Sequence, residues 1–134
     1  MVYSETNFPV RYYETDQMGI VHHSNYIRYF ECARNGLIAD NGYPIQECEK
    51  DGVTIPIVSV ECRFRHPARM GDTVTVTADI DKVPLAKLVV KQAVYNQEGQ
   101  LCAEGQVILG FLNKETGHPV RCPEKLLKMI ELNI

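Results

Sequence analysis

A single helical stretch followed by a run of strand patterns constrains the fold of this chain most strongly. From Ser24 onward, apolar residues recur at spacings of four, three and four, which places them along one side of a helix. Ser24 is a plausible N-cap, and Gly42 lies where a left-handed cap would end the helix. Such a helix would hold about eighteen residues and span roughly 27 Å. Its apolar stripe consists of Tyr26, Phe30, Ala33 and Leu37, widened by Ile27 and Ile38.

Strand patterns occupy most of the remaining chain. They are rich in β-branched residues or alternate between apolar and polar positions, as half-buried strands do, and a hairpin turn at 96–99 joins the last two. The predicted strands cover residues 8–13, 54–65, 73–80, 86–95 and 100–113, and a short closing helix covers 123–132.

This order predicts an α+β fold in which a five-stranded antiparallel sheet wraps one long central helix. No linker or internal repeat divides the chain, so residues 1–134 are expected to form a single domain. One helix covers only one face of such a sheet. The other face and the sheet edges favour self-association, most simply as a two-fold dimer.

Composition and charge exclude several classes of function. The net charge is −3 and the basic residues are spread along the chain, which argues against nucleic-acid binding. No run approaches the ~18 consecutive apolar residues of a membrane span, and the N-terminus lacks a secretory signal. The five cysteines form no C-x-x-C pair, as expected for reduced thiols. We therefore expect a cytoplasmic protein.

The densest polar stretch, residues 13–26, lies at the junction between the first strand and the helix. It places Asp16, Gly19, His22 and His23 just before a helix N-terminus, which offers unpaired N–H groups and partial positive charge. Such a site suits a carbonyl under nucleophilic attack, with a carboxylate as nucleophile or general base. In the alternative interpretation, Asp16 and His23 only cap and order the loop.

A metal site is a weaker interpretation of the same residues. Adjacent histidines project in different directions, and no third histidine or cysteine has ligand spacing. We therefore expect no metal ion at these residues. The cysteines have no recognisable base beside them, so a cysteine nucleophile is not expected either.

The junction and the helix after it resemble the signature of the 4-hydroxybenzoyl-CoA thioesterase-like family. A later run, from Pro56 to Asp72, is also similar to that family. The residues that carry the first resemblance are Asp16, Gly19, Ile20, Val21, His23, Asn25 and Tyr26, then Glu31, Ala33 and Arg34; the second rests on Pro56, Ile57, Val58, Ser59, Phe64, Pro67, Ala68, Arg69, Gly71 and Asp72.

The resemblance implies the hotdog fold and hydrolysis of an acyl-CoA thioester, with no metal, prosthetic group or other cofactor. It assigns Asp16 as nucleophile or general base and the backbone N–H of His23 as the donor that polarises the thioester carbonyl; the His23 side chain could also position water. The implied substrate-binding residues are Gly19, Asn25, the acyl-site segment Ile55, Pro56 and Ile57 (from this subunit or its neighbour) and Lys87. The implied assembly is a dimer or a dimer of dimers, a homotetramer.

Some positions depart from the family pattern or stay undecided. Met18 and His22 stand where relatives often carry a small residue and an aromatic one, and both would lie beside the acyl pocket. Glu31 and Asn35 share a helix face that could line the site or an interface. Tyr26, Tyr29 and Phe30 are expected in the core. Candidate cations for the CoA phosphates are Arg63, Arg65, Arg69, Lys82, Lys87 and Lys91.

Other functions on the same fold remain open. One is a non-catalytic module that binds acyl-CoA or an acyl carrier protein, because a fold does not determine a function. Asp16 argues against it, because a pure binder gains little from an anion near an anionic ligand. An acyl-carrier-protein thioesterase and a hydratase are further alternatives, and the hydratase ranks last.

Overall fold

The computed structural model describes residues 2–134, so Met1, where the predicted domain begins, lies outside the described part. Its main sheet has five strands in the order β1-β4-β5-β6-β3, and every neighbouring pair is antiparallel. The bounds are β1 Val2–Pro9, α1 Ser24–Arg34, α2 Ile45–Lys50, β2 Val53–Thr54, β3 Ile57–Phe64, β4 Thr73–Ile80, β5 Lys87–Tyr95, β6 Leu101–Gly110, β7 Leu112–Asn113 and α3 Glu124–Asn133, with a 3-10 turn, η1, at Tyr12–Glu14.

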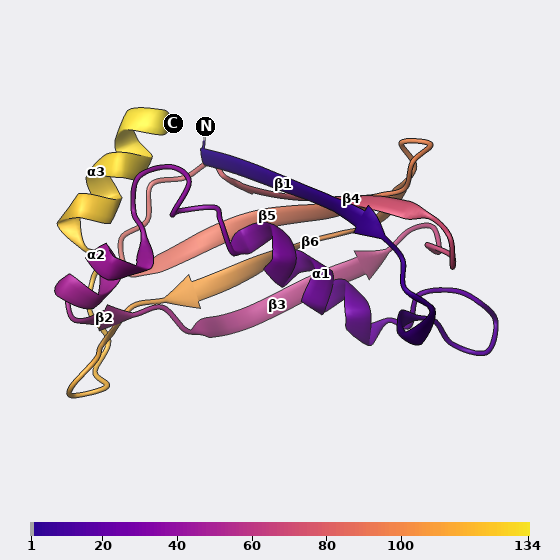
Figure 1. Ribbon diagram of the computed structural model, residues 1–134. Helices are drawn as coiled ribbons and strands as arrows, with labels where there is room; N and C mark the ends of the chain where they lie inside the picture. Colours follow the sequence, from indigo (N-terminus) through magenta and orange to yellow (C-terminus); the bar gives the residue numbers. More distant parts are fainter. Residues whose placement is uncertain (1) are drawn as a thin grey trace.

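The helix α1 lies across one face of the sheet, while α2 and α3 gather at one end of the molecule (Figure 1). The predicted α+β architecture and its five-stranded antiparallel sheet are confirmed. None of the helices within residues 2–134 has the length and apolar character needed to cross a bilayer.

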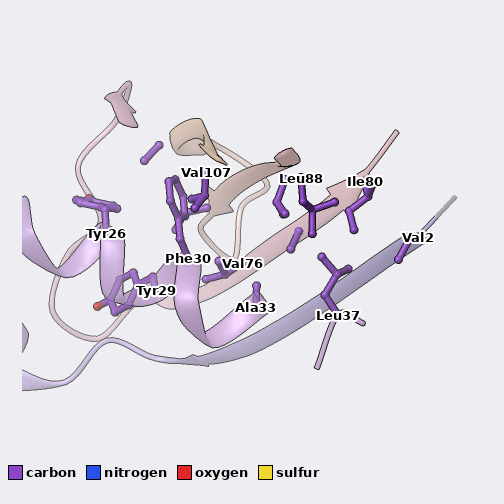
Figure 2. Close-up of a cluster of buried hydrophobic side chains, with 14 of the residues drawn as sticks. Val2, Tyr26, Tyr29, Phe30, Ala33, Leu37, Val76, Ile80, Leu88 and Val107 are labelled. Carbon is purple, nitrogen blue, oxygen red and sulfur yellow. The ribbon is translucent and has the colours of Figure 1, made fainter. Parts of the chain in front are cut away.

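The core fills the space between α1 and the sheet (Figure 2). Tyr29 and Phe30 are fully buried, and Tyr26 packs edge to face with Tyr29 at a ring distance of 5.9 Å. The predicted core placement of these three aromatic residues is therefore confirmed. Ile27, in contrast, is 44% exposed, so it does not widen the buried stripe as predicted. The sheet contributes Val76, Ile80, Leu88 and Val107 to the cluster.

The predicted length of the central helix is wrong. Regular α1 ends at Arg34, after eleven residues, where Asn35 and Gly36 follow with weak helix propensity. The chain continues in tight turns to Gly42, whose φ is 108°. There the N–H of Gly42 donates to the carbonyl of Ala39 and the N–H of Tyr43 to that of Ile38, the pattern of a glycine C-cap. The left-handed cap predicted at Gly42 is thus present, although the helix ends earlier.

The first strand lies earlier in the sequence than predicted. β1 covers residues 2–9 rather than 8–13, and it pairs with β4 along its whole length. Beyond Pro9, the backbone N–H of Arg11 binds the Glu14 carboxylate at 2.7 Å. This local bond competes with strand pairing and turns the chain into η1. Residues 2–7 carry polar side chains on both faces, which hides their strand character in the sequence.

Two predicted strands are each divided by a break. The stretch 54–65 separates at Ile55 and Pro56 into β2 and β3, and the stretch 100–113 separates at Phe111 into β6 and β7. β2 and β7 form a second, two-stranded sheet. Pro56 still joins the two sheets, because its carbonyl accepts the N–H of Gly110 at 2.9 Å.

β6 approaches the edge strand β3 unusually closely at Gly105. Gly105 pairs with Cys62, and an added Cβ would overlap the carbonyl oxygen of Glu61 and lie 2.7 Å from its carbonyl carbon. Only glycine fits this close approach of two backbones. β3 has no further partner in the sheet, and Ile57, Val58 and Phe64 are about half exposed along it.

Candidate active site

The loop from η1 to α1 folds back on itself at the end of the molecule opposite α2 and α3 (Figure 1). Thr15 and Val21 form an antiparallel bridge, and the N–H of Asp16 donates to the carbonyl of Ile20 at 2.9 Å. At the tip, the N–H of Gly19 donates a hydrogen bond to the carbonyl of Asp16. Gly19 has φ of 74°, a conformation that favours glycine. The loop is therefore a defined hairpin rather than a loose connection.

The carboxylate of Asp16 is held at the base of this hairpin. Its Oδ1 accepts the backbone N–H of Met18 at 2.8 Å, an Asx turn. Asp16 is half-buried and forms no ion pair with any described residue. One oxygen is thus used to orient the group, while the other has no hydrogen-bond donor within residues 2–134. A carboxylate oriented in this way can attack a carbonyl or accept a proton from water.

Glu14, a residue to which the sequence analysis assigned no role, fastens the loop to α1. Its buried carboxylate accepts the N–H of Arg11 at 2.7 Å and the hydroxyl of Tyr29 at 2.9 Å. Its backbone carbonyl accepts the N–H of His22 at 2.9 Å and the side-chain amide of Asn25 at 2.8 Å. Burial, reinforced by the bond to Glu14, raises the pKa of Tyr29 and keeps its hydroxyl as a donor.

This arrangement predicts a stability loss for Tyr29→Phe. The change removes one of the two donors to Oε1 of the buried Glu14 carboxylate, and the Arg11 N–H remains. Loss of a buried hydrogen bond to a charged group should lower the free energy of unfolding by about 1–3 kcal/mol. Urea denaturation would measure the loss. Tyr13→Phe is the matched control, because Tyr13 is 80% exposed and should show no change. Equal unfolding midpoints for the two variants would contradict the anchoring role of Glu14.

The N-terminus of α1 leaves one backbone donor available. The ring nitrogen Nδ1 of His22 accepts the N–H of Ser24 at 3.2 Å, and the carbonyl of His22 accepts the N–H of Asn25 at 2.9 Å. The N–H of His23 has no acceptor within residues 2–134. It lies at the positive end of the helix, where a carbonyl oxygen that gains charge would be stabilised.

The predicted N-cap at Ser24 is wrong in one respect. Ser24 is the first residue of α1, so the N-cap is His23, whose side chain forms no capping hydrogen bond. The hydroxyl of Ser24 lies 2.8 Å from Nδ1 of His22 instead. Because Nδ1 accepts the Ser24 N–H, the neutral His22 ring carries its proton on Nε2. The His22 and His23 rings lie 4.1 Å apart.

The remaining predicted site residues do not all gather at this loop. Asn25 is buried and binds the Glu14 carbonyl, so it holds the loop in place. Ile55 and Ile57 line a groove of about 800 Å³ at the other end of α1, together with Glu31 of its last turn and Asn35 just after it. Since eleven helical residues span about 16 Å, one chain does not bring this groove to Asp16.

The candidate phosphate-binding cations lie in different places. Arg69 forms an antiparallel bridge with Ile20 beside the Asp16 loop. Arg63, Arg65 and Lys91 line a separate hollow of about 390 Å³ on the sheet, together with acidic residues. Lys87 is exposed at the start of β5, opposite Gly110, and does not line the groove. Three other candidates pair with acidic neighbours, which favours a role at the solvated surface. These pairs are Arg63 with Glu61, Arg65 with Glu104 and Lys91 with Asp81.

Comparisons with known proteins agree with this fold. The model of the thioesterase-like superfamily matches residues 10–130. YneP of Bacillus subtilis strain 168, provisionally named an acyl-CoA thioesterase, is 35% identical over 118 residues, covering 88% of this chain and 86% of its own. A crystal structure of DHNA-CoA thioesterase from Staphylococcus aureus is 30% identical, with a TM-score of 0.80 over 90% of this chain and 81% of that one.

A more distant structure defines the fold. An Asp-to-Asn mutant of 4-hydroxybenzoyl-CoA thioesterase, complexed with 4-hydroxybenzoyl-CoA, is 20% identical and has a TM-score of 0.85 over 96% of this chain and 99% of that one. The architecture described above is thus the hotdog fold of the thioesterases, as the sequence predicted. The chain belongs to the thioesterase-like superfamily.

Proposed function

We propose that this protein hydrolyses acyl-CoA thioesters to a free acid and CoA, with Asp16 and the His23 end of α1 as its catalytic groups. The observation that carries the proposal is the oriented carboxylate of Asp16, in the loop that leads to the helix-terminal N–H of His23. Among the described residues, 2–134, this carboxylate has no ion-pair partner and this N–H has no acceptor. Such a pair provides what acyl transfer requires, a base or nucleophile and a donor for the carbonyl oxygen. The named functions of YneP and the DHNA-CoA enzyme support the choice of thioester.

Two chemical routes fit these groups. In one, an Asp16 oxygen attacks the thioester carbon, the C–S bond breaks, CoA leaves and takes up a proton, and water then cleaves the resulting anhydride. In the other, Asp16 takes a proton from water as the water oxygen attacks, and that proton passes to the leaving thiol. A single turnover in heavy-oxygen water tests for the first route. Water that cleaves the anhydride at the Asp16 carboxyl carbon leaves its oxygen in Asp16, whereas the second route labels only the released acid, so label in Asp16 identifies the first route.

The acyl-site segment would reach this centre from a second copy of the chain. Ile55 and Ile57 lie at the far end of α1 from Asp16, and the edge strand β3 offers unpaired backbone and half-exposed apolar side chains to another copy. Two-fold pairing along β3 would set Ile55, Pro56 and Ile57 of one subunit against the Asp16 loop of the other. Gly19 keeps its predicted place near the substrate in this proposal. Asn25 supports the site by holding the loop through the Glu14 carbonyl, and Lys87 stays a proposed contact for the CoA part of the substrate.

This assembly predicts a dimer, or a dimer of dimers, in solution. Light scattering at micromolar protein concentration would measure the molar mass against the 15.2 kDa of one chain. A mass of one chain, together with full activity, would contradict a site completed by a second copy. A mass of two or four chains that dissociates with loss of activity on dilution would agree with it.

Release of free thiol from a panel of acyl-CoAs tests the proposed reaction itself. We expect turnover on at least one ester, and the best substrate would begin to define the acyl pocket. The same acyl groups carried on an acyl carrier protein form the second arm of the test. Turnover on the carrier-protein esters alone would replace CoA as the substrate. Binding of CoA esters without any turnover would favour the non-catalytic module.

A further inference from the structure

The groove at the C-terminal end of α1 contains a cation, Arg34, that has no ion-pair partner within residues 2–134. Much of its lining is apolar, from Leu88, Val90 and Leu109 of the sheet and Ile55 and Ile57 before and within β3. Arg34, from the last turn of α1, lines the same groove and is half-buried there. No carboxylate within residues 2–134 forms an ion pair with Arg34.

The guanidinium of Arg34 is nevertheless held in a fixed orientation. Its Nη1 donates to Oε1 of Gln92 at 2.9 Å. Gln92 is itself buried and fastened, because its Nε2 donates to the carbonyl of Phe30 at 2.7 Å. That bond leaves Oε1 as the acceptor that faces Arg34. The other N–H donors of Arg34 have no acceptor within the described residues, and no buried side-chain nitrogen there lacks a partner, so these donors remain accessible.

The environment of Arg34 disfavours its charge. Burial lowers the pKa of Arg34, and the negative charge of Glu31 opposes this effect more weakly. Glu31 and Glu49 also line the groove, but both are solvent-exposed, where screening weakens their field. A half-buried guanidinium with spare donors is best matched by a carboxylate, which binds it in a two-pronged geometry.

From this geometry we propose that the groove holds an acyl group with an apolar body and a carboxylate at its far end, bound by Arg34. The substrate class would be ω-carboxyacyl thioesters. This inference rests on the proposed thioesterase function only in identifying the ligand as an acyl-CoA. The CoA phosphates fit the groove less well, since several of its walls are apolar and a dianion there would need more than one buried cation.

Direct binding tests the proposal without relying on turnover. The ligands are two CoA thioethers, which cannot be hydrolysed: hexyl-CoA and its counterpart with a terminal carboxylate in place of the methyl group. Calorimetry on the wild-type protein should give a dissociation constant about tenfold to hundredfold lower for the carboxylate ligand. Arg34→Met should remove this preference while changing the affinity for hexyl-CoA by less than about twofold.

Two further variants control for charge and fold. Lys114→Met removes another cation that lines the groove but is exposed, and it should keep the preference. Arg34→Lys keeps the charge but loses the planar guanidinium, so this variant should retain only part of the preference for the carboxylate ligand. Equal affinities in the wild type, no binding of either ligand, or a preference that survives Arg34→Met would overturn the proposal. Dissociation of the oligomer by Arg34→Met would also overturn the proposal. The guanidinium would then bind a second copy of the chain rather than a ligand carboxylate.

The outcome is separable from that of the proposed reaction. A carboxylate preference in the thioethers would stand even if no acyl-CoA were hydrolysed. Conversely, rapid hydrolysis of acyl-CoAs with no preference in thioether binding would remove the inference about Arg34 and leave the reaction intact.

Discussion

Asp16→Asn is expected to reduce thioester hydrolysis by about a thousandfold or more while leaving the protein folded. The amide keeps the size of the side chain and can still accept the Met18 N–H through its oxygen. It is neither a nucleophile nor a base at neutral pH, so both routes open to the carboxylate fail. Free-thiol release, followed on the best acyl-CoA of the panel, measures the loss.

Asp81→Asn provides the matched control. It makes the same chemical change at a surface carboxylate whose ion pair with Lys91 is solvent-exposed, and it should leave turnover unchanged. Thermal melting should show that both variants remain folded. Wild-type turnover in Asp16→Asn would show that another group performs the chemistry, and the catalytic assignment of Asp16 would then be wrong.

Gly105→Ala is expected to cause the largest loss of stability of any single methyl addition to the sheet. The new Cβ would overlap the carbonyl of Glu61, so β6 and β3 would have to move apart. The atoms nearest to the new methyl group are backbone atoms of Glu61 and Cys62, so no flexible side chain can move aside to make room. Overpacking of this kind costs about 1–3 kcal/mol and sometimes more, and we expect the upper end here. Urea denaturation measures it through the unfolding midpoint.

Gly110→Ala tests the same residue change at the end of the same strand. There the nearest atom to an added Cβ is a methyl group of Val58, 3.2 Å away, which can shift slightly. The expected loss of stability is below about 1 kcal/mol, the ordinary range for a mild core change. If both variants unfolded at the same urea concentration, the close approach at Gly105 would not be a real constraint. Because β3 is the proposed pairing edge, Gly105→Ala should also weaken the oligomer.

The fold was predictable wherever one physical pattern dominated a segment. Strict alternation at residues 73–80 marked β4 with its bounds, and the stripe through Tyr26, Phe30 and Ala33 marked the buried side of α1. The strand at residues 2–9 was missed because its stability comes from pairing with β4, which a polar local pattern does not reveal. The helix was made too long because the stripe continues to Leu37, which is buried in a turn.

The candidate site likewise contains residues that the local sequence predicts and residues that only the fold brings together. Asp16, Gly19 and the helix start were found because they are adjacent in sequence, and local chemistry is visible there. The hydrogen bond from Tyr29 to Glu14 joins residues fifteen positions apart that only the fold brings together, so no spacing rule in the sequence identifies it. The bond from Arg34 to Gln92 spans 58 positions and depends on which sheet residues face α1. The acidic side chain of Glu14, just before the Asp16 loop, is the sequence signal that could have drawn attention to it.

The short, rigid α1 has a consequence for how such a protein can diversify. One of its ends carries the proposed catalytic groups, and the other lines the groove. Within one chain, about three helical turns separate the two functions. Substitutions in the wall between Asn35 and Ile57 can therefore change which acyl groups are accepted without moving the reacting atoms. A scaffold of this kind allows selectivity to drift under selection while the chemistry stays constant, and laboratory evolution of new acyl preferences should begin in that wall.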